Sequence, residues 1–301
     1  MRIKQQANSA LKRVTGYQLT RGRGPAGAEL RREFDEKLNQ RLTRARERHR
    51  KQRKTMVREI QRLTKEANQA RRQARRRQDR IPSYVDDAAR QILLRSQPRT
   101  LTGLNKLLPL VDAVRYTAEH QIPGAMVECG VWRGGSMQAV AWTLLDAGVG
   151  DRDLHLFDTF EGMSEPTEKD VQTRTGATAA GLLAMGKAMC DAGLDDVQLG
   201  MSETGYPIDR IHFHPGKVED TIPDQAPEQI ALLRLDTDWY ESTKHELEHL
   251  YDRLSPGGVL IIDDFGSWDG ARKATVEWLE ATGEPLLLVP IGAARLAVKP
   301  V

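Results

Sequence analysis

The sequence predicts an α/β protein: a doubly wound, mostly parallel sheet preceded by a long basic helix. From Ala125 onward, short apolar runs that end in Gly or Asp alternate with helical stretches, which is typical of a sheet covered by helices on both faces. Between Ala28 and Ile81 there is neither Gly nor Pro, and the residues there are good helix formers. The 301 residues, 39% of them apolar, suffice for at least one full-sized core.

Charge is distributed unevenly along the chain. Residues 41–80 contain 17 Lys and Arg against 4 Asp and Glu, a local net charge of +13, and the other residues together carry −10. We expect a flexible tail over residues 1–27 and a basic helical arm over 28–81. At a rise of about 1.5 Å per residue such a helix extends roughly 80 Å, so part of it must face solvent or a partner.

The arm has a weak heptad pattern. A seven-residue repeat runs through Leu42, His49, Met56, Leu63 and Ala70. This spacing predicts a coiled-coil seam and hence a homo-oligomer, although arginines also fall in the seam. The alternatives are contact with nucleic acid phosphates or with an anionic membrane surface. Because no aromatic residues are interleaved with the basic ones, specific single-strand recognition is not expected.

Composition excludes several classes of protein. Cys129 and Cys190 are too few for a disulfide framework or a four-cysteine zinc site, which fits a reducing compartment. No run of about 18 apolar residues predicts a transmembrane helix, and the first thirty residues lack the apolar core of a secretory signal. We therefore expect a soluble, cytoplasmic protein.

Two further segments follow the arm. Residues 82–124 predict a helical cover segment with helices over 84–94 and 101–120. The remaining domain, residues 125–301, has helices over 136–147, 242–254 and 270–282. Its predicted strands span residues 125–129, 154–158, 211–214, 231–236, 259–263 and 286–289. Ligands of doubly wound sheets bind outside the carboxyl ends of the strands, so the residues that end these runs are the candidate site.

The first three strand ends predict an adenosine site. The glycine-rich turn from Gly130 to Ser136 allows a tight bend and the close approach of a nucleotide-like ligand. Its spacing departs from G-x-G-x-x-G, which makes a nicotinamide dehydrogenase less expected. Asp158, 28 positions after Gly130, ends the second strand, where a carboxylate can accept hydrogen bonds from ribose hydroxyls. Glu219, after the third strand, is a candidate adenine contact.

The fourth and fifth strands each end in a pair of carboxylates. Asp236 and Asp238 follow one strand, and Asp263 and Asp264 follow the other. If the two strands are neighbours, about 4.8 Å apart, the carboxylates converge and repel one another unless a cation neutralises them. Oxygen ligands without His or Cys favour Mg²⁺ over Zn²⁺. The sequence therefore predicts a magnesium site.

Four segments, in order, resemble the macrocin O-methyltransferase family. They are IPGAMVECGVWRGGS (residues 122–136), FDTFEGM (157–163), LDTDWYEST (235–243) and IDDF (262–265), and the resemblance runs from about Thr100 to Glu280. It implies a class I methyltransferase, Rossmann-like fold. It also implies an enzyme that uses S-adenosylmethionine and Mg²⁺ to methylate sugar hydroxyls, notably on glycosylated antibiotics. The arm before Pro82 is not explained by the resemblance.

The resemblance also assigns roles to individual residues. By motif it implies metal ligands at Asp236, Asp263 and Asp264, a general base at Asp238, and a coenzyme site at Glu128, Gly130, Ser136 and Asp158. Independently of the family, a sugar hydroxyl needs activation before it attacks the sulfonium methyl, and Asp238 could remove its proton. His212 and His214 are the second choice for this base.

Two other functions are compatible with the sequence. A catechol-type O-methyltransferase acting on an aromatic diol would use the same metal chemistry. A scaffold or nucleic-acid-associated protein would use the basic helix and merely bind adenosine, without needing the Asp cluster. The acceptor, the methylated position and the oligomeric state are not decided by the sequence.

Overall fold

The computed structural model describes residues 25–78, 81–186 and 190–301, and the chain divides between Arg75 and Arg76 into two compact units. The first is dominated by α2 (Pro25–Gln78), which begins at a proline, a residue suited to the first helical turn. Ion pairs one turn apart, Lys37 with Glu33 and Arg62 with Glu59, lie on its surface. Residues 1–24 of the expected flexible tail lie outside the described residues, and residues 25–27 belong to α2 rather than to a tail.

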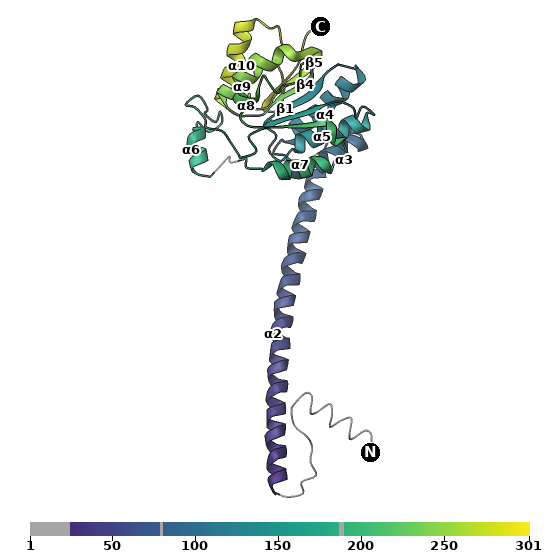
Figure 1. Ribbon diagram of the computed structural model, residues 1–301, viewed down its shortest axis with the longest axis vertical. Helices are drawn as coiled ribbons and strands as arrows, with labels where there is room; N and C mark the ends of the chain where they lie inside the picture. The colour runs from purple at the N-terminus through teal and green to yellow at the C-terminus, as the bar shows by residue number, and fades with distance from the viewer. Residues whose placement is uncertain (1–24, 79–80, 187–189) are drawn as a thin grey trace. The chain divides into compact units, whose positions relative to one another are not determined.

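The second unit contains a seven-stranded sheet in the order β3-β2-β1-β4-β5-β7-β6, whose first five strands are parallel. Its central strands β1, β4 and β5 lie side by side in Figure 1. The strands are β1 (Ala125–Cys129), β2 (Leu154–Asp158), β3 (Ile211–Pro215), β4 (Ile230–Leu235), β5 (Leu254–Ile262), β6 (Val289–Ile291) and β7 (Ala294–Val298). The prediction of a doubly wound, mostly parallel sheet is confirmed.

Helices cover both faces of the sheet. One face packs against α3 (Asp87–Ser96), α4 (Leu104–Glu119), α5 (Gly135–Asp146) and α7 (Leu194–Ser202), and the other against α8 (Val218–Thr221), α9 (Tyr240–Leu250) and α10 (Asp269–Thr282). Along β1 the side chains alternate between the two cores: Met126 enters the first core and Val127 the second. The short α6 (Ala179–Ala184) and the 3₁₀ turns η1 (Gln97–Arg99), η2 (Ile208–Arg210) and η3 (Tyr251–Arg253) complete the unit.

The end of the chain differs from the prediction. The strand expected over residues 286–289 is wrong, because residues 283–288 have no regular structure and Leu287 is exposed. The strand β6 starts at Val289, and Pro290 is tolerated there because β6 lies at the edge of the sheet. It pairs antiparallel with β7, which the apolar pattern did not predict.

The register of the central strands positions the candidate site. Leu235 at the end of β4 lies beside Ile262 at the end of β5, so Asp236 and Asp263 leave the sheet side by side.

Among the helices of the described residues, none combines the length and the apolarity needed to cross a membrane.

Candidate functional site

A cavity of about 210 Å³ opens at the carboxyl ends of β1, β2, β4 and β5. Eight of the nine predicted site residues line it: Gly130, Ser136, Asp158, Glu219, Asp236, Asp238, Asp263 and Asp264. Glu128 does not line the cavity; it is buried beneath it in β1. The fold therefore gathers residues from five separate segments at one rim, where parallel sheets bind their ligands.

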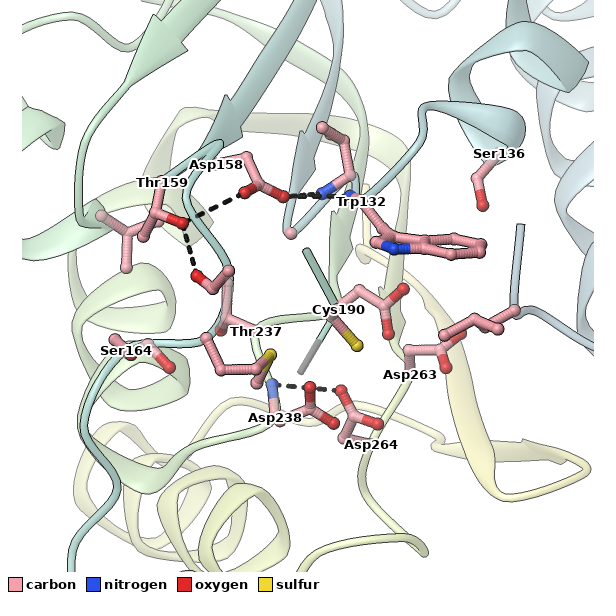
Figure 2. A pocket seen from close by; sticks show the side chains of 18 of the residues that line it. Trp132, Ser136, Asp158, Thr159, Ser164, Cys190, Thr237, Asp238, Asp263 and Asp264 are labelled. Carbon is pink, nitrogen blue, oxygen red and sulfur yellow. Dashed lines mark hydrogen bonds between the residues drawn. The ribbon is translucent and has the colours of Figure 1, made fainter. Parts of the chain in front are cut away.

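The aspartates of β4 and β5 form a compact oxygen cluster. Asp236, Asp263 and Asp264 each offer a carboxylate oxygen, and these oxygens lie within 4.8 Å of one another. Figure 2 shows Asp238, Asp263 and Asp264 together on one side of the pocket. The backbone N–H of Asp238 donates to Asp264 Oδ2 at 3.2 Å, which joins the fourth aspartate to the cluster.

A buried arginine that the sequence analysis did not single out lies beneath these carboxylates. Arg234 of β4 is 2% exposed and pairs with Asp236 at 2.8 Å, with Asp263 at 2.6 Å and with Glu128. Burial opposes its charge, but the three carboxylates hold the pKa of Arg234 well above its usual value. The sequence does contain a sign of its importance: Arg234 interrupts an otherwise apolar strand, and a charged side chain there needs buried partners.

A lysine approaches the cluster from the cover segment. Lys106 of α4 lines the cavity and pairs with Asp263 Oδ2. Burial lowers its pKa, but Asp263 and Asp236 more than compensate, and the pKa of Lys106 is raised. Nothing in the local sequence marks this residue, because its partner lies 157 positions away.

Carboxyl groups outnumber positively charged groups in the site. Burial and nearby carboxylates raise the pKa of Asp236 and Asp264 well above the usual range, whereas Arg234 and Lys106 lower that of Asp263 against the effect of its burial. Burial and the charge of Asp236 raise the pKa of Asp238 to about 7. Five carboxylates, counting Glu128, thus share two cations.

Asp158 braces the turn that follows β1. Its Oδ2 accepts hydrogen bonds from the backbone N–H groups of Val131 at 2.7 Å and Trp132 at 3.0 Å (Figure 2). Its Oδ1 accepts one from the backbone N–H of Phe160 at 2.8 Å. These bonds hold Trp132 in a left-handed conformation with φ of 46°. Asp158 therefore has a structural role that its position as a candidate ribose ligand did not reveal.

A group of hydroxyls lies at the start of α5. Ser136 Oγ is 3.2 Å from Thr100 Oγ1 and 3.4 Å from Thr102 Oγ1, and all three residues line the cavity. The two threonines come from the loop before α4 and were not predicted as site residues. Together with the first amide groups of α5 they form a polar corner suited to an anionic group.

Comparison with known proteins identifies the family. Residues 31–290 match the family of macrocin O-methyltransferase (TylF), which is most of the chain. The chain belongs to this family. It is therefore an S-adenosylmethionine-dependent O-methyltransferase, which excludes the alternative of a non-catalytic scaffold.

The methyltransferase is similar to several proteins of antibiotic biosynthesis. It is 34% identical over 203 residues to the 8-demethyl-8-(2,3-dimethoxy-alpha-L-rhamnosyl)-tetracenomycin-C 4'-O-methyltransferase of Streptomyces olivaceus, covering 64% of this chain and 73% of the relative. It is 35% identical over 185 residues to the mycinamicin III 3''-O-methyltransferase of Micromonospora griseorubida, covering 61% and 71%. The structure of the O-methyltransferase NovP matches with a TM-score of 0.61 and 25% identity, covering 67% and 83%.

The histidines of the methyltransferase lie away from the cavity. His212 Nε2 is 3.0 Å from Asp153 Oδ1, and His214 Nε2 is 3.0 Å from His155 Nδ1, all on β2, β3 and the turn before β2. Among the described residues no histidine lines the cavity. The second choice for the base, His212 or His214, therefore lacks the position that this role requires.

Proposed function

We propose that this methyltransferase moves the methyl group of S-adenosylmethionine to a sugar hydroxyl of a glycosylated natural product or glycan, with Mg²⁺ held by Asp236, Asp263 and Asp264. One observation carries the proposal: the oxygen cluster and the glycine-rich turn open into the same cavity. The relatives support a sugar acceptor, since one is named for a rhamnosyl compound and another for mycinamicin III.

The residues present fit a hard divalent cation. The cluster offers carboxylate oxygens, the ligands that Mg²⁺ prefers. The two cations already there, Arg234 and Lys106, are outnumbered by the five carboxyl groups. A divalent ion would offset most of this excess, which is the physical reason to expect one at this position.

The methyl donor would occupy the part of the cavity formed by the turn after β1 and by α8. Ser136, Thr100 and the first amides of α5 would bind its carboxylate end, because they present donors to an anion. Asp158 and Glu219 line the side where the nucleoside would lie. This placement follows the charges. The donor-rich corner would bind the carboxylate of the methyl donor, and the carboxylates of the cavity would bind its hydroxyl or amino groups.

Asp238 would act as the general base. Its backbone is left-handed, with φ of 67°, and is tied to Asp264, while its side chain lines the cavity. The acceptor oxygen attacks the methyl carbon as the bond from carbon to sulfur breaks, and the hydroxyl proton passes to an Asp238 carboxylate oxygen. When bound, Mg²⁺ supplies a Lewis acid that lowers the pKa of the acceptor hydroxyl.

Two substitutions separate the proposed roles. Asp263→Asn should abolish Mn²⁺ binding measured by electron paramagnetic resonance, together with methyl transfer. Asp238→Asn should keep Mn²⁺ binding but lower kcat by about 10²–10⁴-fold, the usual contribution of a general base. Asp252→Asn, at an exposed aspartate of η3, is the control and should change neither.

The assay uses labelled S-adenosylmethionine with a glycosylated antibiotic that has free sugar hydroxyls, and with catechol. Removal of metal by a chelator should stop transfer, and added Mg²⁺ should restore it. Transfer to catechol but to no sugar would replace the sugar acceptor with an aromatic diol. A folded Asp263→Asn protein that binds Mn²⁺ like the wild type would refute the metal site.

A further inference from the structure

Seven of the eleven basic residues between positions 41 and 65 of α2 share one face of the helix. Positions 41, 44, 48, 51, 55, 58, 62 and 65 advance alternately by three and four residues, so they share a face. No Asp or Glu occurs at any of them, and Thr55 is the one residue that is not Arg or Lys. The members whose side chains the structure describes are all exposed and are named here the basic stripe: Arg41, Arg44, Arg48, Lys51, Arg62 and Lys65.

The apolar residues of α2 lie on the opposite face. Leu42, Met56 and Leu63 of the seven-residue repeat are 46%, 65% and 52% exposed, and Ile60, four residues after Met56, is 56% exposed. At about 100° per residue, Arg44 is roughly 200° around the helix from Leu42. The basic stripe therefore points away from whatever covers the seam, and a partner on one face leaves the other face accessible.

The arrangement disfavours a bilayer as the partner of the basic stripe. A helix that lies on a membrane buries its apolar face and keeps its basic residues beside that face, at the level of the headgroups. In α2 the apolar residues would point into water when the basic stripe met the headgroups. Residues 41–78 also contain no Trp, Tyr or Phe to anchor the helix at the interface.

A nucleic acid duplex fits the basic stripe better. From Arg41 to Lys65 the stripe extends about 36 Å at 1.5 Å per residue, close to one turn of B-form DNA. Arginine dominates it, and the guanidinium group binds phosphate oxygens in a bidentate manner. Arg62 pairs with Glu59 at 2.6 Å, but an exposed pair of this kind is weak and can be exchanged for a phosphate. Without aromatic side chains on which unpaired bases could stack, single strands gain no specific contact.

We propose that the basic stripe of α2 binds the phosphate backbone of a nucleic acid duplex without preference for base sequence. The binding energy is electrostatic, so affinity falls steeply with salt, with a slope of log K against log salt of about −0.9 for each phosphate contacted. The interaction is separate from methyl transfer, because the stripe shares no residue with the cavity.

The test compares two charge reversals of equal size on the same helix. Arg48→Glu with Lys51→Glu alters the basic stripe, and Arg50→Glu with Lys54→Glu alters exposed residues outside it. Binding of the full-length protein to a labelled DNA duplex of about two turns is followed by fluorescence anisotropy between about 50 and 200 mM salt. The stripe variant should lose at least about tenfold in affinity and about 2 in the salt slope, and the control pair much less.

Helix content by circular dichroism and methyl transfer should be unchanged in both variants. Arg48→Gln with Lys51→Gln repeats the test without reversing charge. Equal losses in the stripe and control pairs would overturn the proposal in favour of diffuse attraction. It is also overturned if the wild type binds no duplex at the lowest salt, or binds vesicles of phosphatidylserine and phosphatidylcholine while ignoring DNA.

Discussion

Arg234 links the floor of the cavity to the candidate metal ligands. One guanidinium group donates hydrogen bonds to Asp263 and Glu128 and forms an ion pair with Asp236, and its Nη2 also donates to Thr102 Oγ1 at 2.9 Å. Five donors in a rigid fork can satisfy several carboxylates at once, which a lysine ammonium cannot do in the same geometry. The arginine therefore orients two of the proposed metal ligands while it neutralises part of their charge.

Replacement of Arg234 should lower the stability of the protein substantially. Arg234→Met leaves Glu128 and Asp263 buried without their shared counter-charge, and we expect a loss of about 3–5 kcal/mol in the free energy of unfolding by urea. Arg253→Met is the control: Arg253 is half-buried and donates to the carbonyls of Ala226 and Pro227. It should cost less than half as much.

A double variant checks the cause. Glu128→Gln removes one of the carboxylates left unpaired, so the combination of Glu128→Gln with Arg234→Met should unfold at higher urea than Arg234→Met alone. Simple addition of the two single losses would show that the pairing is not responsible.

Among the structural elements, the turn after β1 has the tightest requirement. Gly130 has φ of 82°, and a Cβ there would overlap the carbonyl of Asp236 at the end of β4. Its N–H donates to the carbonyl of Phe157 on β2, so the turn is held between both neighbouring strands. Glycine is needed here for two reasons, the backbone conformation and the closeness of the next strand.

A comparison of two glycine substitutions distinguishes the conformational requirement from the close contact with β4. Gly148 has φ of 74°, but a Cβ added there would meet no atom within 4 Å. Gly148→Ala should therefore lower the free energy of unfolding only by the conformational cost of a left-handed alanine, about 1–2 kcal/mol. Gly130→Ala should lose clearly more stability, and it should also weaken Mn²⁺ binding because Asp236 must move. If both variants lost the same free energy of unfolding in urea, the contact between the added Cβ and the Asp236 carbonyl would have no effect on stability.

At the scale of the whole molecule, the chain joins a charged helical unit to an enzyme unit. The apolar seam of α2 is exposed in a single chain, and burial of such side chains is worth roughly 25 cal/mol per Å². We propose that the seam assembles the protein into a homo-oligomer. The basic stripe on the opposite face would stay accessible in this assembly.

Sedimentation tests the assembly. The intact chain should sediment as an oligomer, and a chain that begins at Arg76 should sediment as a single copy while it keeps its rate of methyl transfer. Arg76 is chosen because Ile81 packs in the core of the enzyme unit and must be retained. The same number of copies in both chains would remove the coiled-coil interpretation.

Local sequence was sufficient for most of the sheet and for the positions of the candidate site. Five apolar runs became β1 to β5, and the bounds of β1 and β2 agree with the prediction. The Asp pairs could be identified because ligands of doubly wound sheets bind outside the carboxyl ends of the strands, where these residues lie. Their convergence depended on β4 and β5 being neighbours, which the structure shows.

The contacts that the prediction missed join residues far apart in the chain. Lys106 meets Asp263 across 157 positions, and Arg234 meets Glu128 across 106. The antiparallel pair β6 and β7 was missed because both strands are short and neither has a continuous apolar run.

The sequence by itself determined the fold class, the family and the rim of the sheet where the chemistry is placed, because strand periodicity and strand-end motifs are local properties. Only the tertiary structure decided which charges face one another: Arg234 beneath three carboxylates, Lys106 against Asp263, and Asp158 on the backbone of its neighbouring turn. Side-chain pairing depends on register and packing between distant segments, which no local pattern specifies.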